Sequence, residues 1–348
     1  MKAAVWYGKK DVRVEERTLK NLKENELKVK VAWTGICGSD LHEYIDGPIF
    51  IPVDKPDPRT KDKAPITLGH EFSGIVEEVG ANVSELRKGD RVAVYPMITN
   101  GKKPANEDLY DGFSTIGLTT DGGFADYAIV TEDKLYKLPD SMSLEKGALI
   151  EPTAVAVQAL KETNLTIGDS VAVFGAGPIG LLTIMAAKAA GATNIISLDL
   201  SASRLEMAKK VGATYAINTA EQDAIKAIKE ICPDGVDIAF EVAGVEITYK
   251  QAIKATKIRG MVMIIAIFSQ SINWEPMDLT TSAIRVGATL CYEKETFQQT
   301  IQLINEGQIK AETIVTDRIQ LNDIVSKGFE VLNNDKNQSK ILVELSGK

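Results

Sequence analysis

The chain has 348 residues, of which 44% are hydrophobic and 25% are charged, and its formal net charge is −8. This composition is typical of a globular protein, and at roughly 150 residues per domain the length predicts two domains. The acidic balance argues against a nucleic-acid partner, because no basic stripe is available to displace counterions from phosphates. The apolar runs, such as 261–268, have the length of strands, so we expect no membrane span.

The N-terminus and the cysteines bear on the cellular compartment. Residues 1–7 have the pattern of a strand and not that of a signal peptide. Cys37, Cys232 and Cys291 are an odd number of cysteines at wide spacing, which does not make a disulfide framework. We therefore expect a cytoplasmic protein with reduced thiols, in which Cys232 and Cys291 are structural.

The first part of the chain is predicted to be rich in strands. Residues 26–33 alternate apolar and charged side chains with period two, as a half-buried strand does. Further strands are expected at 71–79, 90–94 and 122–130. Between them, residues 47–65 hold five of the twelve prolines and are predicted to be a loop. This loop is long for a simple connection, so it either shapes a site or is a surface excursion.

The pattern changes at about residue 152. A short apolar run at 170–174 is followed by a glycine-rich turn, a long apolar helix pattern and a second strand at 194–199. Strands and helices then alternate as far as 268, which predicts βαβ units and a parallel sheet.

After about residue 291 the pattern is mixed again. Phe297, Ile301 and Ile304 have the spacing of one helix face. A second helix is expected at 322–332 and a closing strand at 340–345.

The glycine-rich turn has the form G-x-G-x-x-G with Gly175, Gly177 and Gly180, and Asp199 ends the next strand. In this context the motif predicts dinucleotide binding: the glycines allow a tight turn, close approach of the pyrophosphate and close helix packing. Asp199 can accept hydrogen bonds from ribose hydroxyls and would repel a 2′-phosphate, which favours NAD over NADP. The alternative is a glycine-rich turn without a ligand. The predicted cofactor-binding residues are Gly175, Gly177, Pro178, Ile179, Gly180, Asp199 and Arg204.

The two histidines and one cysteine lie in two short segments, 35–42 and 69–71. The Cys37 thiolate, the His70 imidazole and a nearby carboxylate could hold a zinc ion with one open position. Glu71 and Glu151 compete for the place of the third ligand. The alternative is that Cys37 is a small buried hydrophobe and His70 an ordinary polar residue, and the residue types alone leave both interpretations open.

These segments resemble the zinc-dependent medium-chain dehydrogenase/reductase family, along essentially the whole chain. Within that family the chain is most similar to the (R,R)-2,3-butanediol dehydrogenases, also called acetoin reductases, and sorbitol and other polyol dehydrogenases are close relatives. The similarity to the butanediol dehydrogenases lies in the segments 46–52 and 63–65. The motifs that carry the family resemblance are Gly35-Ile-Cys-Gly-Ser-Asp-Leu-His42, Gly69-His-Glu-Phe-Ser-Gly74, Gly122-Gly-Phe-Ala-Asp-Tyr127, Glu151-Pro152 and Gly175-Ala-Gly-Pro-Ile-Gly180.

The resemblance implies an α/β fold with two domains. A β-rich, GroES-like catalytic domain is expected from residues 1–152 and 291–348. An NAD-binding Rossmann domain, a doubly wound parallel sheet, is expected from 153–290. Coordination of zinc by Cys37, His70 and a glutamate is also implied.

The resemblance further assigns roles around the metal. Asp40 would orient His70, and Ser39 and His42 match the proton relay of the family. The implied reaction is NAD-dependent oxidation of (R,R)-2,3-butanediol to acetoin and the reverse, in a homodimer or homotetramer. Other interpretations are a sorbitol-type polyol dehydrogenase, a zinc-free reductase of the same fold, and a non-catalytic NAD-binding protein.

One departure from the family pattern concerns a second, structural zinc. Many relatives hold it with four cysteines, but the matching positions here are Asn100, Lys103, Asn106 and Ser114, and none supplies a thiolate. We therefore expect one zinc ion per chain. A second departure is Gln158, which stands where relatives often have His.

Overall fold

The computed structural model describes residues 1–103 and 105–346, with the side chains of 105–107 left aside. The chain divides into two compact units. The first consists of Met1–Glu151, Glu293–Asn305 and Val315–Lys348, and the second of Pro152–Tyr292 and Glu306–Ile314. The segment Glu306–Ile314 thus belongs to the second unit, although the residues before and after it in the chain belong to the first.

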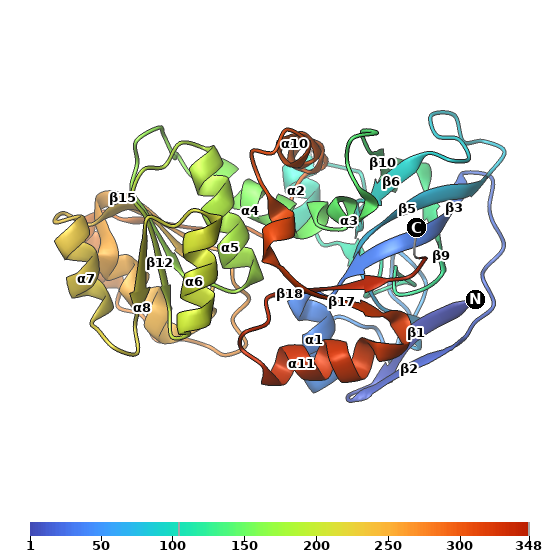
Figure 1. The fold of residues 1–348 in the computed structure, drawn as a ribbon, viewed down its shortest axis with the longest axis horizontal. Helices are drawn as coiled ribbons and strands as arrows, with labels where there is room; N and C mark the ends of the chain where they lie inside the picture. The colour runs from blue at the N-terminus through green and yellow to red at the C-terminus, as the bar shows by residue number, and fades with distance from the viewer. Residues whose placement is uncertain (104, 347–348) are drawn as a thin grey trace. The chain divides into compact units, whose positions relative to one another are not determined.

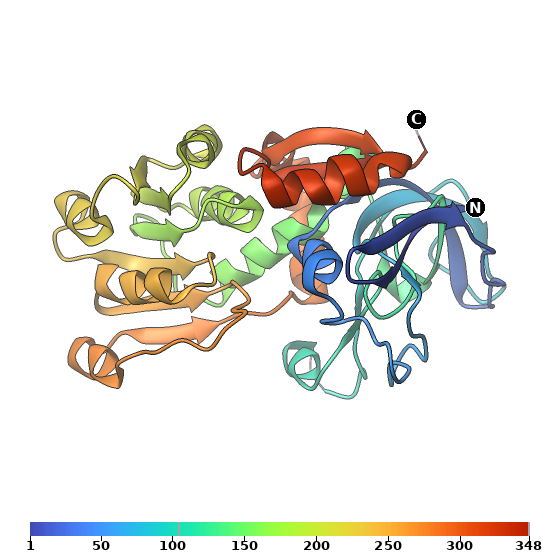
Figure 2. The same cartoon turned by 90° about the horizontal axis from the view of Figure 1, so that it is seen from below.

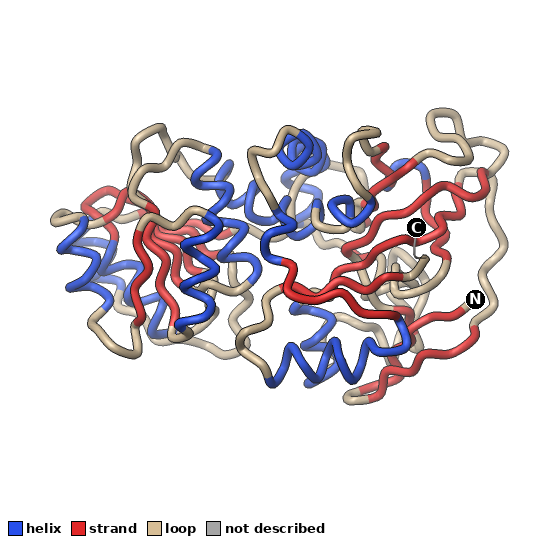
Figure 3. Tube along the Cα trace, viewed as in Figure 1, coloured by secondary structure: helices blue, strands red, loops and turns tan. Residues whose placement is uncertain are grey.

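Strands make up much of the first unit (Figures 1 and 3), and they pair antiparallel except for β17 and β18, which pair parallel. Its largest sheet has the strand order β10-β6-β5-β3-β18-β17, and β9 also pairs with β3. A second sheet has the order β2-β1-β4, and β7 pairs with β8. The strands are β1 (Lys2–Gly8), β2 (Asp11–Glu16), β3 (Glu26–Gly35), β4 (Ile66–Thr67), β5 (Glu71–Val79), β6 (Arg91–Val94), β7 (Met97–Ile98), β8 (Ser114–Thr115), β9 (Tyr127–Thr131), β10 (Leu135–Lys137), β17 (Val315–Gln320) and β18 (Lys340–Glu344).

The period-two pattern of β3 explains the core of this sheet. Leu27, Val29 and Val31 are fully buried and pack with Phe72 and Val76 of β5. The helices of the unit are α1 (Gly38–Asp46), α2 (Ala105–Tyr110), α3 (Leu144–Gly147), α10 (Lys294–Asn305) and α11 (Glu330–Asn334), and α4 (Ile150–Lys161) begins at its end. The predicted helix face of α10 is confirmed, because Phe297, Ile301 and Ile304 are all buried.

The second unit is a six-stranded, entirely parallel sheet with the order β13-β12-β11-β14-β15-β16. Numbered along the chain this is 3-2-1-4-5-6, the order of a doubly wound dinucleotide-binding sheet. The helices α5 and α6 contact one another, as do α7 and α8, and the strands run between the two pairs (Figures 1 and 2). The fold-class prediction is therefore confirmed. The elements are β11 (Val171–Phe174), α5 (Pro178–Ala189), β12 (Ile195–Asp199), α6 (Ala202–Val211), β13 (Tyr215–Asn218), α7 (Ala224–Ile231), β14 (Val236–Glu241), α8 (Glu246–Ala255), β15 (Thr256–Ile264), α9 (Pro276–Ser282) and β16 (Arg285–Ala288).

Two predicted elements differ from the structure. The strand expected at 122–130 begins only at Tyr127, because Gly122 and Gly123 donate backbone hydrogen bonds to the carbonyls of Thr67 and Gly69 in an irregular connection. The helix expected at 322–332 is a succession of 3-10, π and α turns. Among the described residues, no helix has the length and apolarity that crossing a membrane requires.

Candidate active site

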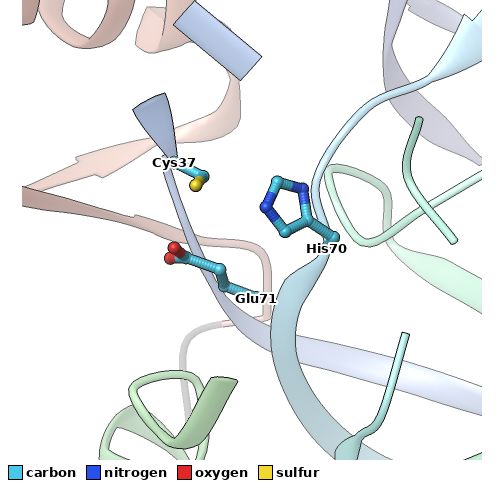
Figure 4. Close-up of side chains that lie close together, drawn as sticks. All are labelled: Cys37, His70 and Glu71. Carbon is cyan, nitrogen blue, oxygen red and sulfur yellow. The ribbon is translucent and has the colours of Figure 1, made fainter. Parts of the chain in front are cut away.

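Three ligand-type side chains come together in the first unit (Figure 4). The Cys37 sulfur, a ring nitrogen of His70 and a carboxylate oxygen of Glu71 all lie within 4.8 Å of one another. Cys37 is the N-cap of α1 directly after β3, and Glu71 is the first residue of β5. Because β3 and β5 are paired antiparallel with Gly35 opposite Glu71, the sheet itself sets the two motifs side by side.

Two glycines of these motifs stand at positions where a Cβ atom would clash with a neighbouring residue. A Cβ on Gly35 would lie 2.1 Å from the Oε2 atom of Glu71. Gly69 has a φ of +95°, and a Cβ there would come within 2.9 Å of the Phe124 ring. Any other residue at Gly35 would displace the Glu71 carboxylate, and a side chain at Gly69 would strain the backbone that carries His70.

A buried lysine from the C-terminal strand accompanies Glu71. The Lys340 ammonium donates to Glu71 Oε1 at 2.6 Å, lies 2.5 Å from Oε2, and donates to the Ile36 carbonyl at 3.0 Å. Lys340 is only 2% exposed and Glu71 is fully buried. Burial alone would lower the pKa of Lys340, but the negative charges of Glu71 and Cys37, with a smaller contribution from Glu151, raise it. Lys340 and Glu71 therefore form a buried ion pair at this site.

His70 is held between two residues of α1. Its Nδ1 atom lies 3.6 Å from Oδ1 of the fully buried Asp40, and its Nε2 atom lies 3.3 Å from the Ser39 hydroxyl. The other oxygen of Asp40 accepts a hydrogen bond from the Cys37 amide at 3.0 Å. Burial alone would lower the pKa of His70, but the negative charges of Asp40 and Cys37 outweigh it and hold the pKa well above its usual value. Asp40 is thus placed to orient both the ring and the cysteine.

The cluster fits a zinc ion by its chemistry. Sulfur, imidazole nitrogen and carboxylate oxygen are the donors that zinc binds, and three protein ligands leave the open position of a catalytic site. Around zinc such donors stand about 3.3–3.8 Å apart, so small side-chain rotations suffice. The Oε2 atom of Glu71 is buried, and the Lys340 ammonium lies 2.5 Å from it without the geometry of a hydrogen bond. Within the same residues, no other group of three or more His, Cys, Asp and Glu side chains has this geometry.

Two predicted residues lie outside this cluster. Glu151, in the first turn of α4, is 7% exposed and is not among the three side chains within 4.8 Å of each other. His42 is exposed on α1, three residues after Ser39. No hydrogen bond joins Ser39 and His42 among the described residues, so a proton relay between them needs another group in the gap.

The proline-rich loop after α1 is fixed by a buried glutamate. The Glu43 carboxylate accepts hydrogen bonds from the backbone amides of Ile49 and Ile51, each at 3.1 Å, and from that of Phe50. Glu43 is fully buried, while the Ile49 and Phe50 side chains are exposed. The start of this loop is therefore held in a defined conformation that presents two apolar side chains.

The glycine-rich motif of the second unit has the geometry its spacing predicts. Gly175 has a φ of +107°, which favours glycine, and a Cβ on Gly180 would lie 1.9 Å from the Gly175 carbonyl oxygen. By contrast, a Cβ on Gly177 would meet nothing within 4 Å. Pro178 and Ile179 begin α5, whose amino end offers free N–H groups toward this open space.

Asp199 organises the same turn. One oxygen accepts a hydrogen bond from the Ala176 amide at 2.8 Å, and the other accepts from the Ser201 amide at 2.9 Å. The Arg204 guanidinium lies 4.0 Å from the carboxylate. The structure thus brings the predicted cofactor residues together at the carboxyl ends of β11 and β12. This is next to the point between β11 and β14 where the strand order of the sheet reverses direction.

Two of the four positions that match the missing structural-zinc cysteines have other partners. Ser114 donates to Asp57 at 2.8 Å, and Lys103 pairs with Asp111 at 3.0 Å. Asp108 accepts from the backbone amide of Gly101 at 2.6 Å. The side chain of Asn106 lies outside the described residues.

Sequence reasoning missed Lys340 and Glu43. A lysine at the start of a strand and a glutamate in a helix are ordinarily exposed, so neither residue type indicates burial. The only available signal for Glu43 was its position just before the proline-rich loop.

Comparison with known proteins agrees with this geometry. Residues 23–140 match the alcohol dehydrogenase GroES-like domain, and residues 178–306 match the zinc-binding dehydrogenase family. The chain is 45% identical to the (R,R)-butanediol dehydrogenase of Bacillus subtilis (strain 168), over 99% of each chain. It is 37% identical to the sorbitol dehydrogenase of the same organism, over 92% of this chain and 90% of that one.

A solved structure extends the comparison to the fold. The crystal structure of 2R,3R-butanediol dehydrogenase from Bacillus subtilis matches with a TM-score of 0.94 and 44% identity over 99% of both chains. The family resemblance found in the sequence is thus confirmed over both units. The chain belongs to the zinc-binding dehydrogenases and is an enzyme of the alcohol dehydrogenase type.

Proposed function

We propose that the enzyme oxidises (R,R)-2,3-butanediol to acetoin, and reduces acetoin in the reverse direction, with zinc and NAD. The observation that carries the chemistry is the cluster of Cys37, His70 and Glu71 with the Ser39 hydroxyl beside it. The substrate is supported by the full-length similarity to a butanediol dehydrogenase.

The proposed zinc ligands are Cys37, His70 and Glu71, with Glu151 as the alternative to Glu71. A zinc ion held there would act as a Lewis acid that lowers the pKa of the alcohol substrate. Asp40 would keep the imidazole in place, because its carboxylate faces Nδ1 and leaves Nε2 for the metal.

The proton of the alcohol is proposed to leave through Ser39. Its hydroxyl lies at the edge of the cluster, 3.3 Å from His70 Nε2, where it can accept a hydrogen bond from a substrate hydroxyl. His42, exposed on the same helix, would pass the proton to solvent.

NAD is the proposed hydride acceptor. Its pyrophosphate would occupy the open space at Gly177 and the amino end of α5, and its adenosine ribose would donate hydrogen bonds to Asp199. The Asp199 charge supports NAD over NADP, although Arg204 at 4.0 Å partly offsets that charge.

The test is NADH formation with stereochemically pure 2,3-butanediols. We expect strong activity with the (R,R) form and weak activity with the (S,S) form. Activity with neither form, in protein that binds zinc and NAD, would show the butanediol assignment to be wrong.

A polyol such as sorbitol is the second candidate substrate, because a sorbitol dehydrogenase is 37% identical to the chain. The same assay with sorbitol in parallel separates the two. A higher kcat/KM for sorbitol than for (R,R)-2,3-butanediol would move the chain to the polyol group with its zinc chemistry unchanged.

We also propose that the enzyme is a homodimer or homotetramer, as its resemblance to the family implies. Light scattering on the purified protein tests this directly. A monomeric mass at assay concentration would contradict it.

A further inference from the structure

Lys340 is unusual among the lysines of the chain in being almost completely buried. Lysine is rarely buried unless it is paired, because removing an ammonium from water costs several kcal/mol. Its ammonium contacts both oxygens of Glu71 and the carbonyl of Ile36, the residue before Cys37. The strand pairing explains this placement, since Leu342 lies opposite Gly35 and the Ile36 amide donates to the Ile341 carbonyl.

We propose that Lys340 is a positioning residue that competes with zinc for the Glu71 carboxylate, and so determines how far Glu71 serves as a metal ligand. The inference rests on the proposed zinc site. In the metal-free protein the ammonium provides the positive charge that a buried carboxylate requires. If zinc binds Glu71 in this position, the carboxylate is shared between two cations, because the Lys340 ammonium already contacts both of its oxygens.

The geometry gives this competition a direction. The Lys340 ammonium donates to Glu71 Oε1 at 2.6 Å and lies 2.5 Å from Oε2, so a zinc ion could reach this carboxylate only by sharing it with the ammonium. The negative charge of Glu151 also interacts with the Lys340 ammonium and contributes to its raised pKa. Lys340 therefore contacts one candidate third ligand and interacts electrostatically with the other. A stronger ion pair between Lys340 and Glu71 favours Glu151 as the third zinc ligand, and a weaker ion pair favours Glu71.

The test is the zinc affinity of four proteins, measured by competition with a chromophoric chelator: wild type, Lys340→Met, Glu71→Gln and the double variant. Removing a positive charge next to the metal should tighten zinc binding by at least about tenfold. If Lys340 competes for Glu71, the gain from Lys340→Met should be at least about tenfold larger with Glu71 present than in the Glu71→Gln background. Equal gains in both backgrounds would mean charge repulsion alone and would overturn the proposal.

Further variants guard against a purely structural effect. Lys340→Arg keeps the cation and should keep the zinc affinity of the wild type. Lys340→Met should lower the thermal midpoint of the zinc-free protein, because Glu71 is left unpaired, and zinc should restore it. The double variant removes both charges and provides a folded protein if the single variant does not fold. Unchanged zinc affinity in Lys340→Met would contradict the proposal, whereas absence of zinc binding in the wild type would contradict the proposed function itself.

Discussion

The metal cluster and the nucleotide turn are built from opposite kinds of chemistry. The cluster consists of side chains, namely the partly buried Cys37 and the buried His70 and Glu71, whose charges are balanced by Lys340 and organised by Asp40. The nucleotide turn consists mostly of backbone, with glycines that leave space and amides that point toward it. The first site should therefore be lost by changing functional groups, and the second by adding atoms.

The largest expected effect separates the two sites by removing one ligand. Cys37→Ser should abolish turnover and zinc binding while leaving NAD binding largely intact. Loss of a residue that only orients a ligand costs about 10–100-fold in metal affinity, and loss of the thiolate itself should cost more. Zinc content and NAD titration measure the two effects separately. Cys232→Ser, a change at a cysteine outside the cluster, is the control and should retain zinc.

Adding one methyl group to the glycine-rich turn should have the opposite result, in which NAD binding is weakened and zinc binding is kept. Gly180→Ala should weaken NAD binding and lower the free energy of unfolding by about 1–3 kcal/mol, because its Cβ would overlap the Gly175 carbonyl. Gly177→Ala is the matched variant: it has room for a Cβ and should unfold like the wild type, yet bind NAD more weakly because the methyl group occupies the place of the pyrophosphate. Both variants should hold zinc normally. Equal stability of the two would contradict this account of the third glycine.

A smaller effect is expected from the acidic side chain that organises the nucleotide turn. Asp199→Asn keeps an oxygen that can accept the Ala176 amide but removes the charge. A hydrogen bond to a charged group contributes about 1.5–3 kcal/mol, so NAD should bind about 10–100-fold more weakly, and NADP should be tolerated better. The ratio of kcat/KM for the two cofactors measures this. An unchanged ratio would show that Asp199 does not select the cofactor.

The smallest effect concerns a charge outside both sites. Burial raises the pKa of Asp133, but a hydrogen bond from Thr131 and the charges of Lys134 and Lys294 outweigh it and lower the pKa to about 2. Because the pKa is lower in the folded state, the stabilisation is complete above about pH 4 and disappears as the pH falls toward 2. Asp133 is half exposed, so Asp133→Asn should cost less than about 1 kcal/mol at pH 7. Denaturant unfolding at several pH values checks this, and a cost that persisted at pH 2 would contradict it.

The comparison also explains how much could be predicted from the sequence. Gly175 and Gly180 were predictable because backbone geometry and close packing restrict their positions to glycine, and Gly177 was predictable because a dinucleotide needs the space beside it. Cys37 and His70 were predictable because few residue types bind zinc and this chain has few of them. The parallel sheet followed from the alternation of strands and helices.

The remainder depends on contacts between segments distant in the chain. Lys340 reaches Glu71 only because β18 pairs with β3, and no local pattern indicates that pairing. The choice between Glu71 and Glu151 was open for the same reason, since both are acidic residues next to a motif. The connection at Gly122 and Gly123 was predicted to be a strand because its composition does not show that its amides bond irregularly to Thr67 and Gly69.

The central claim is that one zinc ion, at Cys37, His70 and a glutamate, enables this enzyme to oxidise a diol with NAD. The most direct test is to titrate zinc into metal-free protein and to follow NADH formation from (R,R)-2,3-butanediol at each addition. The account predicts that activity rises in proportion to zinc and stops rising at one ion per chain. Full activity without zinc, or a plateau only at two ions per chain, would contradict it.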